Sequence, residues 1–325
     1  MEKVTMADVA KAAGVSKSTV SQYLNNRFEY MGEKTKLKIQ EAIEELGYQP
    51  NFIARSLKQK RTSMVGIIVA NITHYFSTEI SRAIEDFCHT HDLHAIVCNA
   101  DDDPEKEKKY IEMLRAKQVD GLIIFPTGQN NDLYESMVRQ GYPVVFVDRR
   151  VENLEVFSVI TDNAESTYKA VQHFIEQGHQ NIAFVVQPLK VSTRIDRLAG
   201  YKKALVDAGL EVNPNLIIEA SISDMKSELE RLFSLEGKPT ALFAANDRVF
   251  LEVGEFLKEK GIKLDNELEL AVFDNIPFAH LLDAPISFIT QPATEMGKKA
   301  AELLFGQINK ENNPPEVFVF PSEIL

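Results

Sequence analysis

Three polar side chains near the N-terminus have the chemistry and the spacing that reading DNA bases requires. Lys17, Ser18 and Gln22 would lie on one region of a short helix that follows a glycine. Lys can donate to guanine N7 and O6, and Gln can pair with adenine through two hydrogen bonds. Three short side chains around them suit phosphate oxygens: Ser16, Ser21 and Asn25. This set could therefore contact both the bases and the backbone of a duplex.

These side chains need a helix to present them, and residues 1–49 have the pattern of a small helical unit. Thr5 can cap a first helix, with Asp8 completing an approximate capping box and Gly14 ending the helix. Further helices are predicted at Lys17–Leu24 and Lys34–Leu46. Six apolar residues could form their core: Val9, Val15, Val20, Leu24, Ile43 and Leu46. The spacing fits a helix-turn-helix and, equally well, a plain three-helix bundle.

The charge is divided unevenly along the chain. The 325 residues carry a formal net charge of −12. Residues 1–61 hold 11 Lys or Arg and 7 Asp or Glu, a net charge of +4, so the remaining 264 residues carry −16. A basic N-terminal part on an acidic body indicates that only the N-terminal part meets a polyanion.

After residue 61 the pattern changes to buried strands that alternate with amphipathic helices. Eight apolar runs predict strands: 64–70, 95–98, 121–125, 143–148, 181–187, 215–219, 240–244 and 269–273. Seven stretches predict helices: 78–92, 104–118, 131–140, 164–177, 194–208, 224–234 and 247–260. Such alternation is typical of parallel sheets, and the pattern starts again near residue 181, which indicates two lobes. Ligands of such sheets bind where the strands end, so a cleft is expected there.

Several functional classes find no support in the sequence. The two cysteines cannot form a disulfide framework or a four-thiolate zinc site, and they fit a reducing cytosol. No signal peptide or membrane-spanning run is present, so a cytoplasmic protein is expected. Four histidines lack the spacing of metal ligands and are interpreted as ordinary polar residues: His74, His89, His91 and His94. No nucleophile–base pair or phosphate-binding loop stands out. We therefore expect no enzyme activity, no metal and no cofactor.

Motifs along nearly the whole chain resemble the LacI/GalR family of bacterial repressors. In the N-terminal part these are Val4-Thr5-Met6-Ala7-Asp8-Val9-Ala10, Ala13-Gly14-Val15-Ser16 and Leu46-Gly47-Tyr48-Gln49-Pro50-Asn51. In the body they include Gln177-Gly178-His179, Arg197-Leu198-x-Gly200-Tyr201, Ala245-Asn246-Asp247, Phe273-Asp274-Asn275 and Thr290-Gln291-Pro292. Two departures are Gln22, where the family often has Arg, and Gly32, where a Ser usually caps the third helix. The first of them indicates a different operator.

The resemblance implies an all-α helix-turn-helix headpiece over residues 1–49 and a hinge helix over 50–61. The implied DNA contacts are Thr5, Ser16, Lys17, Ser18, Ser21, Gln22, Asn25, Asn51, Ala54, Leu57 and Lys58. Leu57 is carried over as a wedge that enters the minor groove and kinks the duplex. The hinge is short and basic, so it should be flexible when free and helical on DNA.

For residues 62–325 the resemblance implies an α/β body with the fold of periplasmic sugar-binding proteins. Its N-lobe would comprise about 62–161 and 292–320, and its C-lobe about 162–290 and 321–325. The implied effector contacts are Tyr75, Phe76, Phe125, Asp148, Thr193, Arg197, Ile222, Asn246 and Asp274. The polar members suit hydroxyl groups, the aromatic ones can wall a carbon chain, and Arg197 offers a planar fork for a carboxylate. An ion pair or cap to Asp196 or Asp247 is the alternative role for Arg197.

The predicted function is that of a homodimeric repressor, each headpiece of which reads half of a pseudo-palindromic operator. A small sugar or sugar acid would bind between the lobes and change operator affinity. The stretch Asn99–Lys108 and the recognition helix are most similar to 2-keto-3-deoxygluconate operon repressors, which makes that acid a candidate effector. The alternative is a catabolite-control-type regulator activated by a phosphorylated carrier protein. A pure sugar-binding protein or an enzyme of similar fold is disfavoured by the headpiece.

Overall fold

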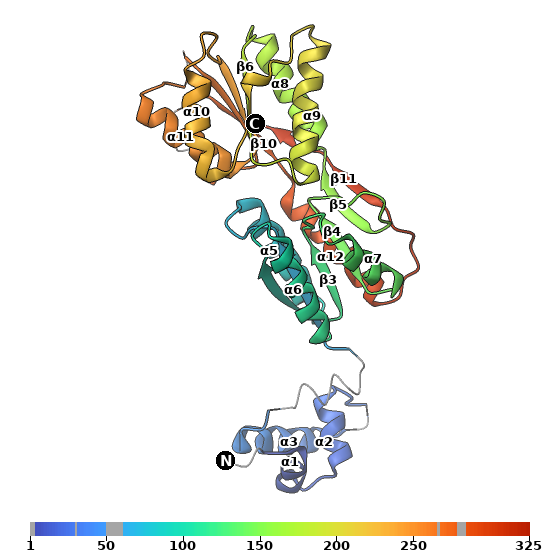
Figure 1. The fold of residues 1–325 in the computed structure, drawn as a ribbon. Helices are drawn as coiled ribbons and strands as arrows, with labels where there is room; N and C mark the ends of the chain where they lie inside the picture. The colour runs from blue at the N-terminus through green and yellow to red at the C-terminus, as the bar shows by residue number, and fades with distance from the viewer. Residues whose placement is uncertain (1–3, 30, 50–60, 265–266, 278–283) are drawn as a thin grey trace. The chain divides into compact units, whose positions relative to one another are not determined.

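The computed structural model describes residues 4–29, 31–49, 61–264, 267–277 and 284–325 (Figure 1). The chain divides into two compact units, Met1–Thr62 and Ser63–Leu325. We call the described part of the first unit up to residue 49 the headpiece, and the second unit the body. None of the helices in these residues has the length and apolar composition needed to cross a membrane.

The headpiece consists of α1 (Met6–Ala13), α2 (Lys17–Leu24) and α3 (Glu33–Leu46). The backbone N–H and the hydroxyl of Thr5 both donate to Asp8 Oδ2, at 2.8 and 2.6 Å, which closes the predicted box at the start of α1. Gly14 ends this helix in the left-handed conformation with φ of 66°. The prediction of three helices is confirmed, with α3 beginning one residue before the predicted start.

One small apolar core holds the headpiece together. Its buried members are Val9, Ala10, Ala13, Val20, Ile39, Ala42 and Tyr48. The other four residues predicted for this core lie partly buried around it: Val15, Leu24, Ile43 and Leu46. All three helices contact one another. This packing fixes the orientation of α2 and leaves one of its faces exposed.

The described residues of the body form two six-stranded sheets, and each lies at the centre of a lobe. The N-lobe sheet has the order β11-β5-β4-β3-β1-β2, with all of its pairs parallel. Its strands are β1 (Met64–Val69), β2 (His94–Asn99), β3 (Gly121–Ile124), β4 (Val144–Val147), β5 (Phe157–Thr161) and β11 (Val317–Phe320). The C-lobe sheet has the order β12-β10-β9-β8-β6-β7, and only β12 among them runs antiparallel to its neighbour. Its strands are β6 (Ile182–Val186), β7 (Ile217–Glu219), β8 (Ala241–Ala244), β9 (Glu269–Phe273), β10 (Ile286–Thr290) and β12 (Glu323–Ile324).

Helices cover both faces of each sheet, as they must where parallel strands are joined by crossovers. In the N-lobe they are α5 (Tyr75–Thr90), α6 (Pro104–Ala116), α7 (Asn131–Arg139) and α12 (Ala293–Ile308). In the C-lobe they are α8 (Asn163–Glu176), α9 (Ser192–Asp207), α10 (Ile222–Phe233) and α11 (Asp247–Lys260), with a short 3₁₀ turn at Pro214–Leu216. Each lobe therefore has two apolar cores, one on either side of its sheet.

The packing of α9 against α8 positions the residues at the start of α9. A Cβ atom built on Gly200 would lie 2.1 Å from the carbonyl oxygen of Ala164, so no larger residue fits between these helices. Gly200 belongs to the Arg197–Tyr201 motif, and Tyr201 donates a hydrogen bond to the carbonyl of Ile182 at 2.8 Å. The motif thus fixes one helix on its sheet.

The predicted α/β body with parallel sheets is confirmed, but the eight predicted strands omit four. These are β5, β10, β11 and β12, and α12 was not predicted either. They lie around the segments where the chain passes from one sheet to the other, after β5, after β10 and after β11. The passage after β5 and the passage after β11 contact each other. Thr161 Oγ1 pairs with Ser322 Oγ at 2.7 Å, and Asp162 Oδ1 accepts from Ser322 N at 2.9 Å.

Candidate functional site

The exposed face of α2 carries the side chains that the sequence predicted for base contacts. Lys17, Ser18 and Gln22 are all exposed. Neither Lys17 nor Gln22 has a side-chain hydrogen bond to another residue that the structure describes. Ser18 Oγ lies 2.6 Å from Ser16 Oγ. Lys17 and Gln22 are therefore available to an external partner without loss of an internal contact.

The predicted phosphate contacts have structural roles as well. Ser16 Oγ caps α2 by accepting a hydrogen bond from Thr19 N at 3.1 Å. Asn25 Nδ2 donates to the carbonyl of Ser21 at 2.6 Å, which closes the other end of the helix. Four of the predicted DNA contacts lie outside the described residues: Asn51, Ala54, Leu57 and Lys58.

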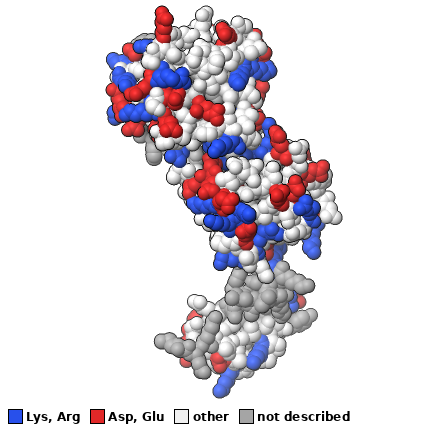
Figure 2. All heavy atoms as spheres, in the orientation of Figure 1, with Lys and Arg blue, Asp and Glu red and all other residues white. Residues whose placement is uncertain are grey.

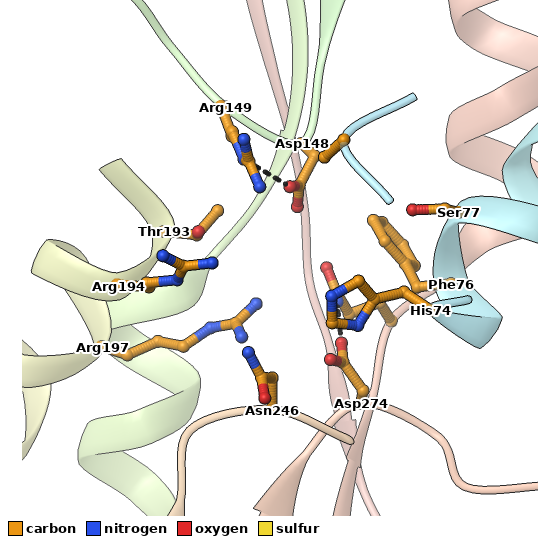
Figure 3. Close-up of a pocket in the computed structure, with 12 residues that line it drawn as sticks. His74, Phe76, Ser77, Asp148, Arg149, Thr193, Arg194, Arg197, Asn246 and Asp274 are labelled. Carbon is orange, nitrogen blue, oxygen red and sulfur yellow. Dashed lines mark hydrogen bonds and ion pairs between the residues drawn. The ribbon is translucent and has the colours of Figure 1, made fainter. Parts of the chain in front are cut away.

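A small polar cavity of about 40 Å³ lies between the two lobes of the body (Figure 3). The residues that line it are Ala70, His74, Phe76, Ser77, Asp148, Arg149, Thr193, Arg194, Arg197, Asn246, Asp274 and Gln291. Arg194 and Arg197 extend from α9 toward its centre, and His74 and Phe76 face them from the other side. Both lobes therefore supply functional groups to one site.

Six of the nine predicted effector contacts line this cavity: Phe76, Asp148, Thr193, Arg197, Asn246 and Asp274. The other three do not. Phe125 packs in the N-lobe core on the same face as Ile123 and is 1% exposed. Tyr75 lines a separate hollow with Glu79, and Ile222 lies half-buried at the start of α10.

Both cavity aspartates adopt a backbone conformation that is uncommon for residues with a side chain. Asp148 directly follows β4 with φ of 70°, and Asp274 directly follows β9 with φ of 95°. Such conformations cost free energy and concentrate at functional sites, where surrounding contacts hold them. The backbone N–H of Asp274 is held by the carbonyl of Ile289 at 3.0 Å. The chain thus bends sharply at two strand ends to bring carboxylates into the cavity.

Three helices begin at the cavity, and their N-termini bring positive electrostatic potential to it. His74 precedes α5, Thr193 lies in the first turn of α9, and Asn246 caps α11. Asn246 Oδ1 accepts from Val249 N at 2.9 Å, and its Nδ2 donates to Gln187 Oε1 at 2.8 Å. The helix ends favour anionic or hydroxyl-bearing ligands and also stabilise the aspartates.

Arg197 is fixed in place by its surroundings. Its Nε donates to Asn163 Oδ1 at 2.7 Å, and its Nη1 donates to the carbonyl of Ala245 at 2.6 Å. The guanidinium also lies 3.5 Å from the ring centroid of Phe273. Its Nη2 makes no hydrogen bond to another described residue, although the arginine is buried. One edge of a rigidly held cation is thus presented to the cavity.

Asp274 is buried among groups of both signs. Burial raises its pKa to about 7; Arg197 opposes this shift, whereas Asp247 and Asp148 add to it. Gln291 Nε2 donates to Asp274 Oδ1 at 2.5 Å. Near neutral pH this carboxyl group therefore exists in both protonation states, and it can donate or accept a hydrogen bond.

Polar contacts cross from lobe to lobe around the cavity. His74 Nδ1 of the N-lobe pairs with Asp247 Oδ1 of the C-lobe. Arg150 Nη2 lies 2.8 Å from Asp196 Oδ1. His74, Asp247 and Asp274 also place possible ligand atoms within 4.8 Å of one another, close enough to hold a metal ion. Because Asp247 already engages His74 Nδ1, their present arrangement is that of an inter-lobe ion pair.

Comparison with known proteins agrees with both parts of this description. Residues 5–51 match the family model of bacterial regulatory proteins of the lacI family. Residues 62–324 match the model of periplasmic binding proteins and the sugar binding domain of the LacI family. The chain belongs to the LacI family. It is thus a DNA-binding transcriptional regulator with a sugar-binding type of domain and not an enzyme.

Named relatives cover almost the whole chain. The probable HTH-type transcriptional regulator EndR of Paenibacillus polymyxa is 45% identical over 96% of this chain and 93% of its own length. KdgR of Bacillus subtilis is 31% identical over 99% of this chain and 96% of its own. Several relatives called PurR reach similar identity, for example 32% in Vibrio atlanticus. KdgR is thus no more similar to this chain than the PurR relatives are, and it is less similar than EndR. Sequence identity therefore does not single out the predicted subfamily, the 2-keto-3-deoxygluconate operon repressors.

The Lac repressor in a crystal structure bound to ONPG is 25% identical to the chain, with a TM-score of 0.87. That likeness covers 100% of this chain and 98% of the repressor. Its extent confirms the predicted fold class, a helix-turn-helix headpiece followed by a two-lobed α/β body.

The predicted effector set of this LacI-family protein omitted six cavity residues: Ala70, His74, Ser77, Arg149, Arg194 and Gln291. A signal existed for Arg194, because it precedes Arg197 by three positions and so shares one face of a helix. Arg149 directly follows the predicted contact Asp148; it is 6% exposed and pairs with Asp148 and Asp102, whereas Arg150 is exposed. His74 was interpreted as an ordinary polar residue, and its inter-lobe partner lies 173 positions away.

Proposed function

We propose that the protein is a homodimeric repressor that reads a pseudo-palindromic operator through α2 of each headpiece. The observation that carries this proposal is the exposed set of Lys17, Ser18 and Gln22, free of competing ion pairs among the described residues. Thr5, Ser16, Ser21 and Asn25 are proposed phosphate contacts around it. The two-fold symmetry of a dimer demands a two-fold related operator.

The proposed effector is a small sugar or sugar acid bound in the inter-lobe cavity. Hydroxyl groups find acceptors in Asp148 and Asp274 and donors in Arg197 and Thr193. Phe76 supplies an apolar wall. A relative structure shows cellobiose in complex with the regulator CelR, which is 24% identical to this chain. The lining of alternating donors and acceptors is what supports a polyol here.

Within that class we propose an acid, such as 2-keto-3-deoxygluconate, as the preferred effector. Arg197 Nη2 faces the cavity without a partner among the described residues, and the N-terminus of α9 begins beside it with no acidic residue in its first turn. A carboxylate would satisfy both the guanidinium and the helix end. A neutral sugar leaves that buried donor with only a hydroxyl partner.

Effector entry requires a change in the body. The cavity of about 40 Å³ has room for only a few water molecules, each of which needs about 10–15 Å³ of such space. Pockets that bind small molecules typically measure about 300–1,000 Å³. We therefore propose that the lobes separate or rotate when the effector binds, and that this motion biases the hinge segment 50–61 between its coil and helical states.

Two binding measurements test this proposal. Fluorescence anisotropy with labelled operator should show tight binding that weakens steeply with salt, because each neutralised phosphate releases a counterion. Calorimetry should show that 2-keto-3-deoxygluconate binds at least ~10-fold more tightly than its neutral sugar analogue. Equal affinity for acid and neutral analogue would contradict the proposed carboxylate contact. Binding of neither, together with operator affinity that no sugar changes, would contradict the effector proposal as a whole.

A further inference from the structure

The carboxylate of Asp102 lies between two guanidinium groups that come from different lobes. Its Oδ1 is 2.7 Å from Arg149 Nη2, and its Oδ2 accepts a hydrogen bond from Arg194 Nη2 at 2.8 Å. Arg149 follows β4 of the N-lobe, whereas Arg194 belongs to α9 of the C-lobe. One carboxylate thus joins the two lobes, with one oxygen for each arginine.

Both arginines are buried and need an anion; Arg149 Nε also lies 3.3 Å from Asp148 Oδ2, whereas Arg194 forms an ion pair only with Asp102 among the described residues. The side chains of Arg149 and Arg194 are 7% and 9% exposed, and that of Asp102 is 26% exposed. A charge removed from water is costly unless it is paired and hydrogen-bonded. Burial alone would raise the pKa of Asp102, but the two arginines outweigh burial and hold that pKa below its usual range. Asp102 is therefore ionised at neutral pH and serves as the counter-ion of both arginines in this structure.

The loop after β2 holds Asp102 in a strained conformation. Asp101 and Asp102 have φ values of 55° and 56°, in the left-handed region. Asp102 N donates to the carbonyl of Ala70 at 2.8 Å, and Asp103 Oδ1 caps α6 by accepting from Glu105 N at 2.8 Å. Contacts on both sides thus impose a backbone that an unconstrained aspartate seldom adopts. The carboxylate is placed by the loop and not by chance rotation of a surface side chain.

The arginines, but not Asp102, are among the residues that line the cavity. We propose that Arg149 and Arg194 form an anion site between the lobes, which Asp102 fills in this structure and which a carboxylate or phosphate group of a small molecule can fill in its place. The inference rests on the proposed effector role of the cavity and adds to it an anion subsite separate from Arg197. A ligand anion there competes with the chain's own carboxylate, so binding exchanges an internal link between the lobes for one through the ligand.

Chemical rescue of a glycine variant tests this inference on the full chain. Asp102→Gly removes the carboxylate and suits the local backbone, because glycine adopts positive φ without strain. It should lower the melting temperature by several degrees, and sodium formate should restore it where sodium chloride at equal ionic strength does not. Inorganic phosphate in a parallel titration distinguishes a phosphate preference from a carboxylate preference.

The neighbouring residue provides a matched control. Asp101 has almost the same φ, but it is exposed and pairs with Lys106 of the same lobe at 2.5 Å. Asp101→Gly should respond to formate no more than to chloride, and adding Arg194→Gln to Asp102→Gly should abolish the rescue. If Asp102→Gly fails to fold, Asp102→Asn against Asp101→Asn gives the same comparison, because Asn tolerates the left-handed region.

Two results would overturn the inference. One is a formate and phosphate response of the Asp102 variants no larger than that to chloride. The other is an equal response of the Asp101 variants. Neither result depends on which effector the wild-type protein binds, so a failure of the proposed function is recognised separately, by calorimetry with sugars and acids on the wild-type chain.

Discussion

The headpiece and the body place their functional side chains in opposite surroundings. In the headpiece, Lys17 and Gln22 lie within six residues of one helix and are exposed. In the body, Arg149, Arg197 and Asp274 are almost fully buried and come from three distant parts of the chain. An exposed group needs only a helix that points it outward. A buried charge needs partners, and those partners connect the two lobes.

This difference separates the two functions physically. The headpiece can change its base contacts without disturbing its fold, because these side chains lie outside its core. In the body a ligand that takes one partner from a buried charge must change the contacts of the others. Figure 2 shows acidic and basic side chains interspersed over the visible face of the body, so the distinguishing charges are those inside the cavity. We therefore expect ligand binding in the cavity to change the contacts between the lobes.

Deleting residues 1–61 should produce the largest effect and test whether the parts are separable. Operator binding should fall below detection, since the proposed base and phosphate contacts all lie in this segment. The body has its own apolar cores in both lobes, so it should remain folded and keep its effector affinity. Anisotropy with operator and calorimetry with effector measure the two outcomes. Residual specific operator binding by the shortened chain would show that the body also reads DNA.

The pH dependence of unfolding should reveal the buried charges of the body. In the folded chain the pKa of Asp274 is raised to about 7, so this state binds more protons than the unfolded state between about pH 4 and 7. The free energy of unfolding should therefore fall as pH rises through that interval, by about 1.4 kcal/mol for each pKa unit of an isolated group. The pKa of His74 is also raised: burial lowers it, but Asp247 outweighs burial, and this adds a loss in the same direction.

The variant Asp274→Asn separates the contribution of Asp274 to this pH dependence from that of His74. The amide resembles the protonated carboxyl and can still accept from Gln291 Nε2. Denaturant titrations from about pH 5 to pH 8 should show a flatter dependence in this variant than in the wild type, with the His74 share retained. A slope that Asp274→Asn leaves unchanged would show that Asp274 stays ionised across the range.

Sequence prediction was also more accurate for the headpiece than for the body. The α2 bounds were predicted without error because its cap, its turn and its apolar positions lie within ten residues of one another. Strands such as β1 and β9 were recognised from continuous apolar runs. The two-residue strand β12 has no such signal; it is defined only by pairing with β10. Elements that exist through distant pairing leave little trace in local sequence.

The prediction of the cavity residues was limited in the same way, by contacts between distant parts of the sequence. The resemblance to LacI/GalR repressors, which maps effector contacts onto strand ends, located Asp148 and Asp274. It also selected Phe125, but alternation along β3 turns this ring to the core side with Ile123. Arg194 was missed although it shares a helix face with Arg197, because its hydrogen-bond partner Asp102 is 92 positions away. The chemistry of a strand end is thus predictable, whereas the partners of a buried charge are not.

The same truncation in the core of the headpiece and in the core of the body should affect their stability to different extents. Val20 in the headpiece and Val185 in the body are both 0% exposed. Truncating either to Ala removes two methyl groups, for a loss of about 2 kcal/mol including the cavity left behind. A unit the size of the headpiece has a total of about 2–7 kcal/mol, so Val20→Ala should remove a large share of the free energy of unfolding of the headpiece. Val185→Ala should lower the melting temperature of the body by only a few degrees, and hydrogen exchange measured region by region should resolve the two effects.

Gln22→Ala should weaken operator binding without destabilising the headpiece. The exposed side chain has no hydrogen bond to another described residue, so truncation removes only an external contact. We expect a loss of roughly 1–2 kcal/mol on the cognate operator, at the lower end of the values for one base contact, and less on DNA mismatched at that base pair. Anisotropy with both duplexes measures the difference. An equal loss on the two would assign Gln22 a role other than base recognition.

The smallest effect is expected from an exposed ion pair of the headpiece. Glu33 Oε1 lies 2.6 Å from Lys36 Nζ in the first turn of α3, and the Glu33 side chain is 81% exposed. Water and salt screen such a pair, so Glu33→Gln should change the free energy of unfolding by about 0.5 kcal/mol or less, with part of the change due to the helix N-terminus. Raising the salt concentration should remove most of the difference between the variant and the wild type. The link between Asp102 and Arg194, which is far less exposed, should by contrast keep most of its effect in high salt. If both pairs respond to salt alike, burial does not distinguish the charges of the body from those of the headpiece.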